Sequence, residues 1–218
     1  MHDPHEIAAY ARFKEIWAVL DIARFTPAPP AAEAMVLAMR TFAARYHQRL
    51  LALNPGVDVS GFFHIRIDPE VDSGARVLEG EPISFAAFLG RRYDIAGDRV
   101  LTAREANADA DSDHDGLARA LLSPPYGLKN DKARWGKFGS AQYLERECAW
   151  QREILRDFLR EVLAIEDPRE TEHLQIHRWP TDWSNYFDAG NEWWGTHAWS
   201  IADSRAGWLT VVCASASD

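Results

Sequence analysis

The chain has 218 residues, of which 47% are hydrophobic and 26% charged, and its formal charge is −9 at pH 7. This is the composition of a globular protein with a substantial core, and no apolar run approaches the roughly 18 residues that span a membrane. The net negative charge argues against nonspecific binding to DNA or anionic lipid, so we expect neither nucleic acid nor membrane as a partner.

The first quarter of the chain predicts a pair of helices over about 5–53. Between residues 5 and 25, apolar side chains recur at steps of three and four, which places them on one side of a helix. Prolines between residues 26 and 30 end that pattern. A second helix is predicted over Ala31–Leu53, with an apolar stripe of Met35, Met39, Phe42, Tyr46 and Leu50. The short, stiff connection favours antiparallel packing.

The middle of the chain is less regular. Residues 57–67 alternate between apolar and mixed side chains, which predicts a strand. A short helix is predicted over residues 84–93, and a mobile acidic loop is predicted over about 94–116. A further short helix is expected over residues 117–122, before two consecutive prolines.

The last third predicts a long helix and then strands. The helix covers residues 138–165, with a buried stripe of Tyr143, Trp150, Ile154, Phe158 and Val162. A strand is expected over residues 173–179, and a hairpin with arms 194–201 and 208–214. The final arm is apolar on both faces, which indicates that both are covered. We therefore predict a single α+β domain, with an antiparallel sheet of about four strands packed against long helices and a tryptophan-rich C-terminal hairpin.

An acidic run resembles the start of an EF-hand calcium loop. Asp111, Asp113 and Asp115 occupy positions 1, 3 and 5, and Gly116 occupies position 6. Position 12 is Leu122 instead of the bidentate glutamate that the loop requires. The run therefore predicts weak cation contacts at most, and we expect neither a resident metal nor a cofactor.

The most informative feature is the tail, which holds six of the nine tryptophans between residues 179 and 218. Tryptophan dominates any core or interface that it enters. The high density of tryptophan indicates that the tail anchors the fold, and it is also compatible with a recognition surface. The candidate binding residues are Trp179, Trp183, Tyr186, Trp193 and Trp194.

Catalysis is an alternative for the same segment. Glycoside cleavage uses a pair of carboxylates about 5–9 Å apart beside aromatic rings, and a histidine next to a carboxylate can act as a general base. The candidates are Asp182, Asp188, Glu192, His177 and His197. Asp182 and Asp188 could instead have a structural role, because aspartate side chains commonly cap turns by accepting hydrogen bonds from backbone amides.

A binding role is favoured over catalysis. We expect a cytoplasmic interaction module of immunity or inhibitor type, with an acidic and aromatic face for a basic protein partner. A hydrolase with its site in the tail and a small-ligand binder are the alternatives, and a homo-oligomer is compatible with the sequence. The N-terminus lacks the features of a signal peptide, and Cys148 and Cys213 are expected to be buried thiols.

Overall fold

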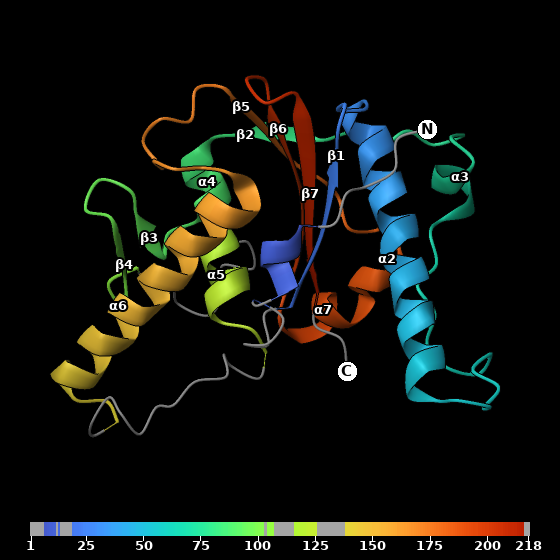
Figure 1. The fold of residues 1–218 in the computed structure, drawn as a ribbon, viewed down its shortest axis with the longest axis horizontal. Coiled ribbons are helices and arrows are strands. Elements are labelled where there is room, and N and C mark those ends of the chain that lie inside the picture. Colours follow the sequence, from blue (N-terminus) through green and yellow to red (C-terminus); the bar gives the residue numbers. More distant parts are fainter. Residues whose placement is uncertain are drawn as a thin grey trace. The chain divides into compact units, whose positions relative to one another are not determined.

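The computed structural model describes residues 7–11, 13, 19–102, 104–106, 116–125 and 138–215, without the side chain of Trp193 (Figure 1). It divides into two compact units. Unit 1 comprises Met1–Glu6, Asp21–Pro82 and His177–Asp218, and unit 2 comprises Ile7–Leu20 and Ile83–Ile176. Helices and antiparallel strands occur together, so the α+β prediction is confirmed. The prediction of a single domain stays a prediction.

The main sheet has five strands, one more than predicted. The order is β1-β7-β6-β5-β2. The strands are β1 (Leu20–Phe25), β2 (Glu81–Ile83), β5 (Leu174–Arg178), β6 (Thr196–Asp203) and β7 (Trp208–Ser215). The predicted hairpin is confirmed, because β6 and β7 pair antiparallel from Thr196↔Ser215 to Asp203↔Trp208. Gly207 closes its turn at a φ of +73°, a conformation that favours glycine.

The prediction of a helix over residues 5–25 is wrong at its C-terminal end. Residues 8–10 form a 3₁₀ helix, η1 (Ala8–Tyr10), but residues 20–25 form β1, next to β7 in the sheet. Four of the six residues of β1 are buried. Pairing with a neighbouring strand therefore overrides the local helical pattern, as tertiary contacts commonly do.

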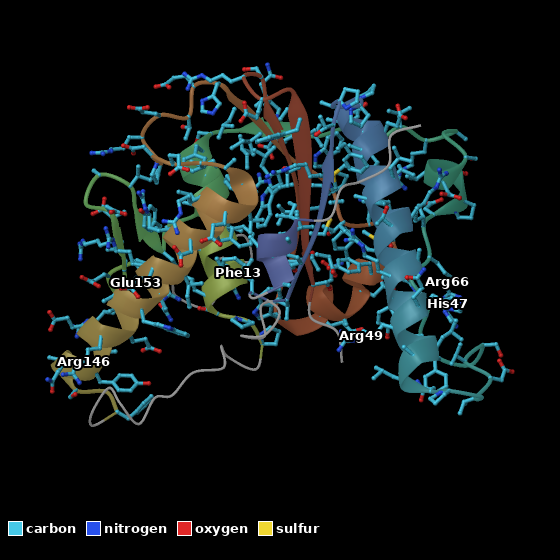
Figure 2. All side chains as sticks on the ribbon, in the orientation of Figure 1. Phe13, His47, Arg49, Arg66, Arg146 and Glu153 are labelled. Carbon is cyan, nitrogen blue, oxygen red and sulfur yellow. The ribbon has the colours of Figure 1, made fainter. Side chains whose placement is uncertain are left out.

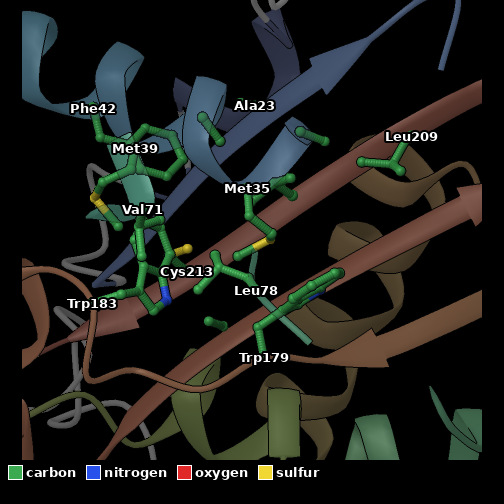
Figure 3. Packing of buried hydrophobic residues seen from close by; sticks show 14 of the residues in the cluster. Ala23, Met35, Met39, Phe42, Val71, Leu78, Trp179, Trp183, Leu209 and Cys213 are labelled. Carbon is green, nitrogen blue, oxygen red and sulfur yellow. The ribbon is translucent and has the colours of Figure 1, made fainter. Parts of the chain in front are cut away.

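Helix α2 (Ala31–Leu53) has the predicted boundaries and covers one face of the β6–β7 hairpin (Figure 1). Met35, Met39 and Phe42 from the predicted stripe are buried in a cluster with Leu209 and Cys213 of β7 (Figure 3). Burial raises the pKa of the Cys213 thiol well above its usual value, so this thiol is an inert part of the core. Cys148 is also a free thiol and is half-buried.

The opposite face of β7 is buried as well. Thr210, Val212 and Ala214 point away from the α2 cluster and are at most 1% exposed. The final strand is thus covered on both faces, as its sequence predicts.

Unit 2 is built around a long helix with a cluster of short elements. Its elements after η1 are α4 (Phe85–Leu89), β3 (Tyr93–Asp94), β4 (Arg99–Val100), α5 (Gly116–Leu122), α6 (Ala141–Asp157) and a π-helical turn, η3 (Phe158–Val162). The first part of the predicted mobile loop is instead the antiparallel pair β3–β4, whereas residues 107–115 lie outside the described residues.

The buried stripe of the long helix agrees with the predicted one at Tyr143, Phe158 and Val162 but differs from it between them. Trp150 and Ile154 are only half-buried, whereas Gln151 and Leu155 are buried. Gln151 is tolerated inside because its Oε1 accepts a hydrogen bond from Arg92 Nη2 at 3.2 Å. None of the helices in the described part of the chain is long and apolar enough to cross a membrane.

Candidate functional site

Four of the six tail tryptophans lie inside the protein. Their exposed fractions are between 1% and 7%. They are Trp179, Trp183, Trp194 and Trp199. Trp208 is half-buried, and the guanidinium carbon of Arg24 lies 4.3 Å from the centre of its ring. The side chain of Trp193 lies outside the described residues.

The buried indoles have hydrogen-bond acceptors, as buried Trp N–H groups usually do. Trp179 Nε1 donates to Ser200 Oγ at 2.9 Å, and Trp183 Nε1 donates to the Pro180 carbonyl at 2.7 Å. Trp179 also packs so closely on Gly80 that a Cβ there would lie 2.9 Å from its ring. These contacts make the two indoles parts of the core.

Tyr186 is the predicted binding residue with a partly accessible ring. It is half-buried, its ring lies against Phe42 and Phe187, and its hydroxyl donates to Asp21 Oδ2 at 3.0 Å. A binding role for the aromatic residues of the tail stays a prediction. The indoles of Trp179, Trp183 and Trp194 are themselves enclosed.

The two candidate histidines are both held against tryptophans. His197, on β6, is 6% exposed and stacks on Trp199 with ring centroids 4.7 Å apart, while Trp194 meets its edge at 6.2 Å. His177, on β5 as predicted, lies 6.0 Å from the Trp179 ring. Aromatic rings thus pack against both imidazoles, on two sides of His197 and on one side of His177.

The three candidate carboxylates are at the surface. Asp182 is 70% exposed and accepts from Arg76 Nη2 at 3.0 Å. Asp188 and Glu192 are exposed on the short helix α7 (Asp188–Trp193), one helical turn apart. The fold thus brings only this last pair together, and it does so on an open helix face. Asp182 pairs with Arg76, whereas His177 and His197 pack on tryptophan rings.

A polar clamp in the tail was not anticipated from the sequence. The predicted strand over residues 57–67 is wrong, because this segment contains a turn at residues 60–61 and makes only one isolated bridge, Ile67↔Ser184. Its backbone is held by side chains instead. Asn185 Oδ1 accepts from the Arg66 amide at 2.6 Å, Asn185 Nδ2 donates to the His64 carbonyl at 2.9 Å, and Ser184 Oγ donates to the Arg66 carbonyl at 2.8 Å. The turn that begins the 3₁₀ helix η4 (Asn185–Phe187) is therefore an anchor for residues 64–68.

A group of carboxylates begins beside this clamp and continues along the chain into β2. We call it the acidic edge, and it comprises the carboxylates of α3 (Pro69–Asp72), its N-cap, the segment leading into β2 and the 180s turn. Its members are Asp68, Glu70, Asp72, Glu79, Glu81 and Asp182. Three arginines neutralise it only in part: Arg40 pairs with Asp72 at 2.8 Å, Arg76 with Asp68 and Asp182, and Arg178 with Glu81 at 2.5 Å. Six carboxylates against three guanidinium groups leave this edge negative.

The acidic edge is fixed from within. Val71 and Leu78 are 3% and 5% exposed and belong to the same cluster as Met35 and Trp183 (Figure 3). The Trp183 carbonyl accepts from the Asp68 amide at 2.8 Å, and Gly80 rests on the Trp179 ring. The tail tryptophans therefore set the position of the carboxylate-bearing backbone.

The weak cation candidates Asp111, Asp113 and Asp115 lie outside the described residues. Within the ranges that the structure does describe, no group of three or more His, Cys, Asp or Glu side chains could hold a metal ion. The chain matches no family model, no curated protein and no solved structure.

Proposed function

We propose that the protein is a macromolecular interaction module of the immunity or inhibitor type, which binds a basic protein partner through the acidic edge. The observation that carries the proposal is an exposed set of carboxylates on a backbone anchored by buried Val71, Leu78 and Trp179. A surface that is already ordered before binding loses less conformational entropy on association. Complementary charge accelerates encounter and selects against partners of the wrong sign.

In this proposal the acidic and aromatic character of the face is divided between two layers. The carboxylates are outside, and the indoles of Trp179 and Trp183 are directly beneath. The hydrolase and small-ligand alternatives have weaker support, because the candidate carboxylates are exposed while His197 is enclosed by tryptophan rings.

Charge reversal on the acidic edge tests the proposal. Glu70 and Glu79 are exposed and form no ion pair within the described part of the chain, so Glu70→Lys/Glu79→Lys should fold normally. The variant should bind a fluorescent oligo-arginine peptide more weakly by about fivefold or more, because two attractive charges become repulsive. The measurement is made at low salt, where such contacts are screened little. Fluorescence anisotropy measures the change.

The matched control is Glu145→Lys/Glu153→Lys, which makes the same change in net charge at two exposed positions of α6. The control should change binding by about twofold or less, because these two charges belong to unit 2 and are not part of the acidic edge. Equal losses in the two variants would mean that the peptide senses only the overall charge, and the acidic edge would then have no special role.

A further inference from the structure

One region of unit 1 concentrates exposed apolar side chains. Five of the eight large hydrophobic residues that are exposed in the described structure lie within residues 51–63, at the C-terminal end of α2 and in the loop that follows. We call this the α2-end patch, and its members are Leu51, Leu53, Val57, Phe62 and Phe63, with exposed fractions of 44–67%. Exposed apolar side chains that gather in one segment of a chain are candidates for an interaction site.

The α2-end patch is held in place. The Phe63 ring meets the edge of Tyr46 of α2 at 5.8 Å, and the neighbouring rings of His64 and His47 lie 5.5 Å apart. His64 Nε2 is 2.9 Å from the carbonyl oxygen of Val59, a residue that is only 5% exposed. The loop then enters the clamp formed by Ser184 and Asn185. The exposed phenylalanines therefore sit on an ordered loop that is tied at both ends.

The chain segment that carries the patch is positive, in contrast to the chain as a whole. Between residues 41 and 67 there are three arginines and a single carboxylate, Asp58. The Asp58 carboxylate is occupied by the backbone amide and hydroxyl of Ser60, and Arg45 donates to the Ile22 carbonyl. Arg49 and Arg66 are exposed and form no ion pair with another described residue. Figure 2 shows both arginines, together with His47, beside the C-terminal half of α2.

We propose that the α2-end patch is a second docking surface, whose occupant is an acidic amphipathic polypeptide segment. The apolar residues of the segment would cover Leu53 and Phe62, and its carboxylates would pair with Arg49 and Arg66. Aromatic residues and arginine are the types enriched at the centres of protein interfaces. The proposal does not depend on the acidic edge, because the two surfaces take partners of opposite charge.

Two other occupants fit the charges less well. An anionic membrane would gain only about 1 kcal/mol from each of two arginines, and it would repel a chain with a net charge of −9. A symmetric dimer formed through this patch would bring two copies of the same positive segment into one interface. A separate acidic segment avoids this meeting of like charges.

The test uses three labelled helical peptides with the same leucine and phenylalanine positions on one face. Their remaining positions carry glutamate, glutamine or lysine. Fluorescence anisotropy with the full chain should give the tightest binding for the glutamate peptide, by about tenfold or more over the other two. Arg49→Glu/Arg66→Glu and Phe62→Ser/Phe63→Ser should each weaken that binding by about tenfold or more.

Matched controls are available elsewhere in the chain. Arg104→Glu/Arg205→Glu makes the same charge change at two exposed arginines, and Phe138→Ser/Leu144→Ser removes two exposed apolar side chains. Neither should weaken binding by more than about twofold, and melting temperatures report whether all four variants fold. The proposal is overturned if no peptide binds, if the glutamine or lysine peptide binds as well as the glutamate one, or if the controls lose as much as the patch variants. It is also overturned if the patch phenylalanines instead determine binding to phosphatidylglycerol vesicles or self-association in sedimentation.

Discussion

Replacing Trp183 with alanine should lower the free energy of unfolding by about 3–5 kcal/mol, the cost of deleting a large buried aromatic side chain. Trp183 is 1% exposed and shares a cluster with Met39, Val71 and Cys213 (Figure 3). Its ring meets Phe187 with centroids 5.8 Å apart. The cavity would lie beneath the point where the Trp183 carbonyl holds the Asp68 amide, so the acidic edge should also loosen. Urea unfolding followed by circular dichroism measures the loss.

Two further variants separate packing from other effects. Trp183→Phe keeps an aromatic ring but removes the hydrogen bond to the Pro180 carbonyl, so its cost should be smaller, about 1–2 kcal/mol. Trp208→Ala removes a half-buried ring that rests on Arg24, and it should cost less than Trp183→Ala. An alanine at position 183 that costs no more than one at position 208 would show that Trp183 does not anchor the core.

Gly190→Ala should destabilise the protein by about 1–3 kcal/mol through overpacking, although alanine is ordinarily favoured over glycine inside a helix by about 0.5–1 kcal/mol. Gly190 lies in α7, where an added Cβ would be 2.6 Å from the Gly195 carbonyl oxygen and 2.7 Å from Ser215 Oγ. The first contact involves backbone, which cannot rotate away. The carbonyl of Gly190 also accepts from the Gly195 amide at 2.7 Å. The clash should therefore push α7 away from β7, with a loss visible in urea unfolding.

Gly61→Ala is the matched control. An added Cβ at Gly61 meets nothing within 4 Å, and this glycine has no left-handed φ. The substitution should be neutral or stabilising by about 0.4–1 kcal/mol, because it restricts the unfolded chain. Stabilisation by alanine at both positions would mean that α7 is not closely packed on β7.

Elements with a strong local pattern could be predicted from the sequence. Helix α2 has an apolar stripe and a proline-rich start, and its boundaries are as predicted. The β6–β7 hairpin was recognisable from two apolar runs around a turn that contains Gly207. In both cases the local signal and the tertiary environment agree.

The elements that were predicted wrongly depend on distant partners. Residues 20–25 continue a helical pattern but pair beside β7, almost two hundred residues further along the chain. Residues 57–67 alternate like a strand, but their backbone bonds go to the side chains of Ser184 and Asn185. The same clamp leaves Phe62 and Phe63 exposed, so the α2-end patch could not be anticipated from alternation alone.

The tail was identified correctly as an anchor, because the size of tryptophan makes burial favourable wherever several of them gather. Which surface the tail supports could not be deduced. The acidic edge combines residues 68–81 with Asp182, and only the folded chain brings these segments together through Arg76. Its carboxylates belong to short elements without a periodic signal.

Fluorine NMR of the chain labelled with 5-fluorotryptophan tests most directly whether the tail indoles form the interior of the protein. Resonances can be assigned with single Trp→Phe variants, and the shift between H2O and D2O reports the contact of each ring with solvent. The structure predicts almost no solvent shift for Trp179, Trp183, Trp194 and Trp199, and a measurable shift for Trp208. Solvent shifts at Trp179 and Trp183 as large as that of free fluorotryptophan would contradict the account, because those rings would then line an open surface.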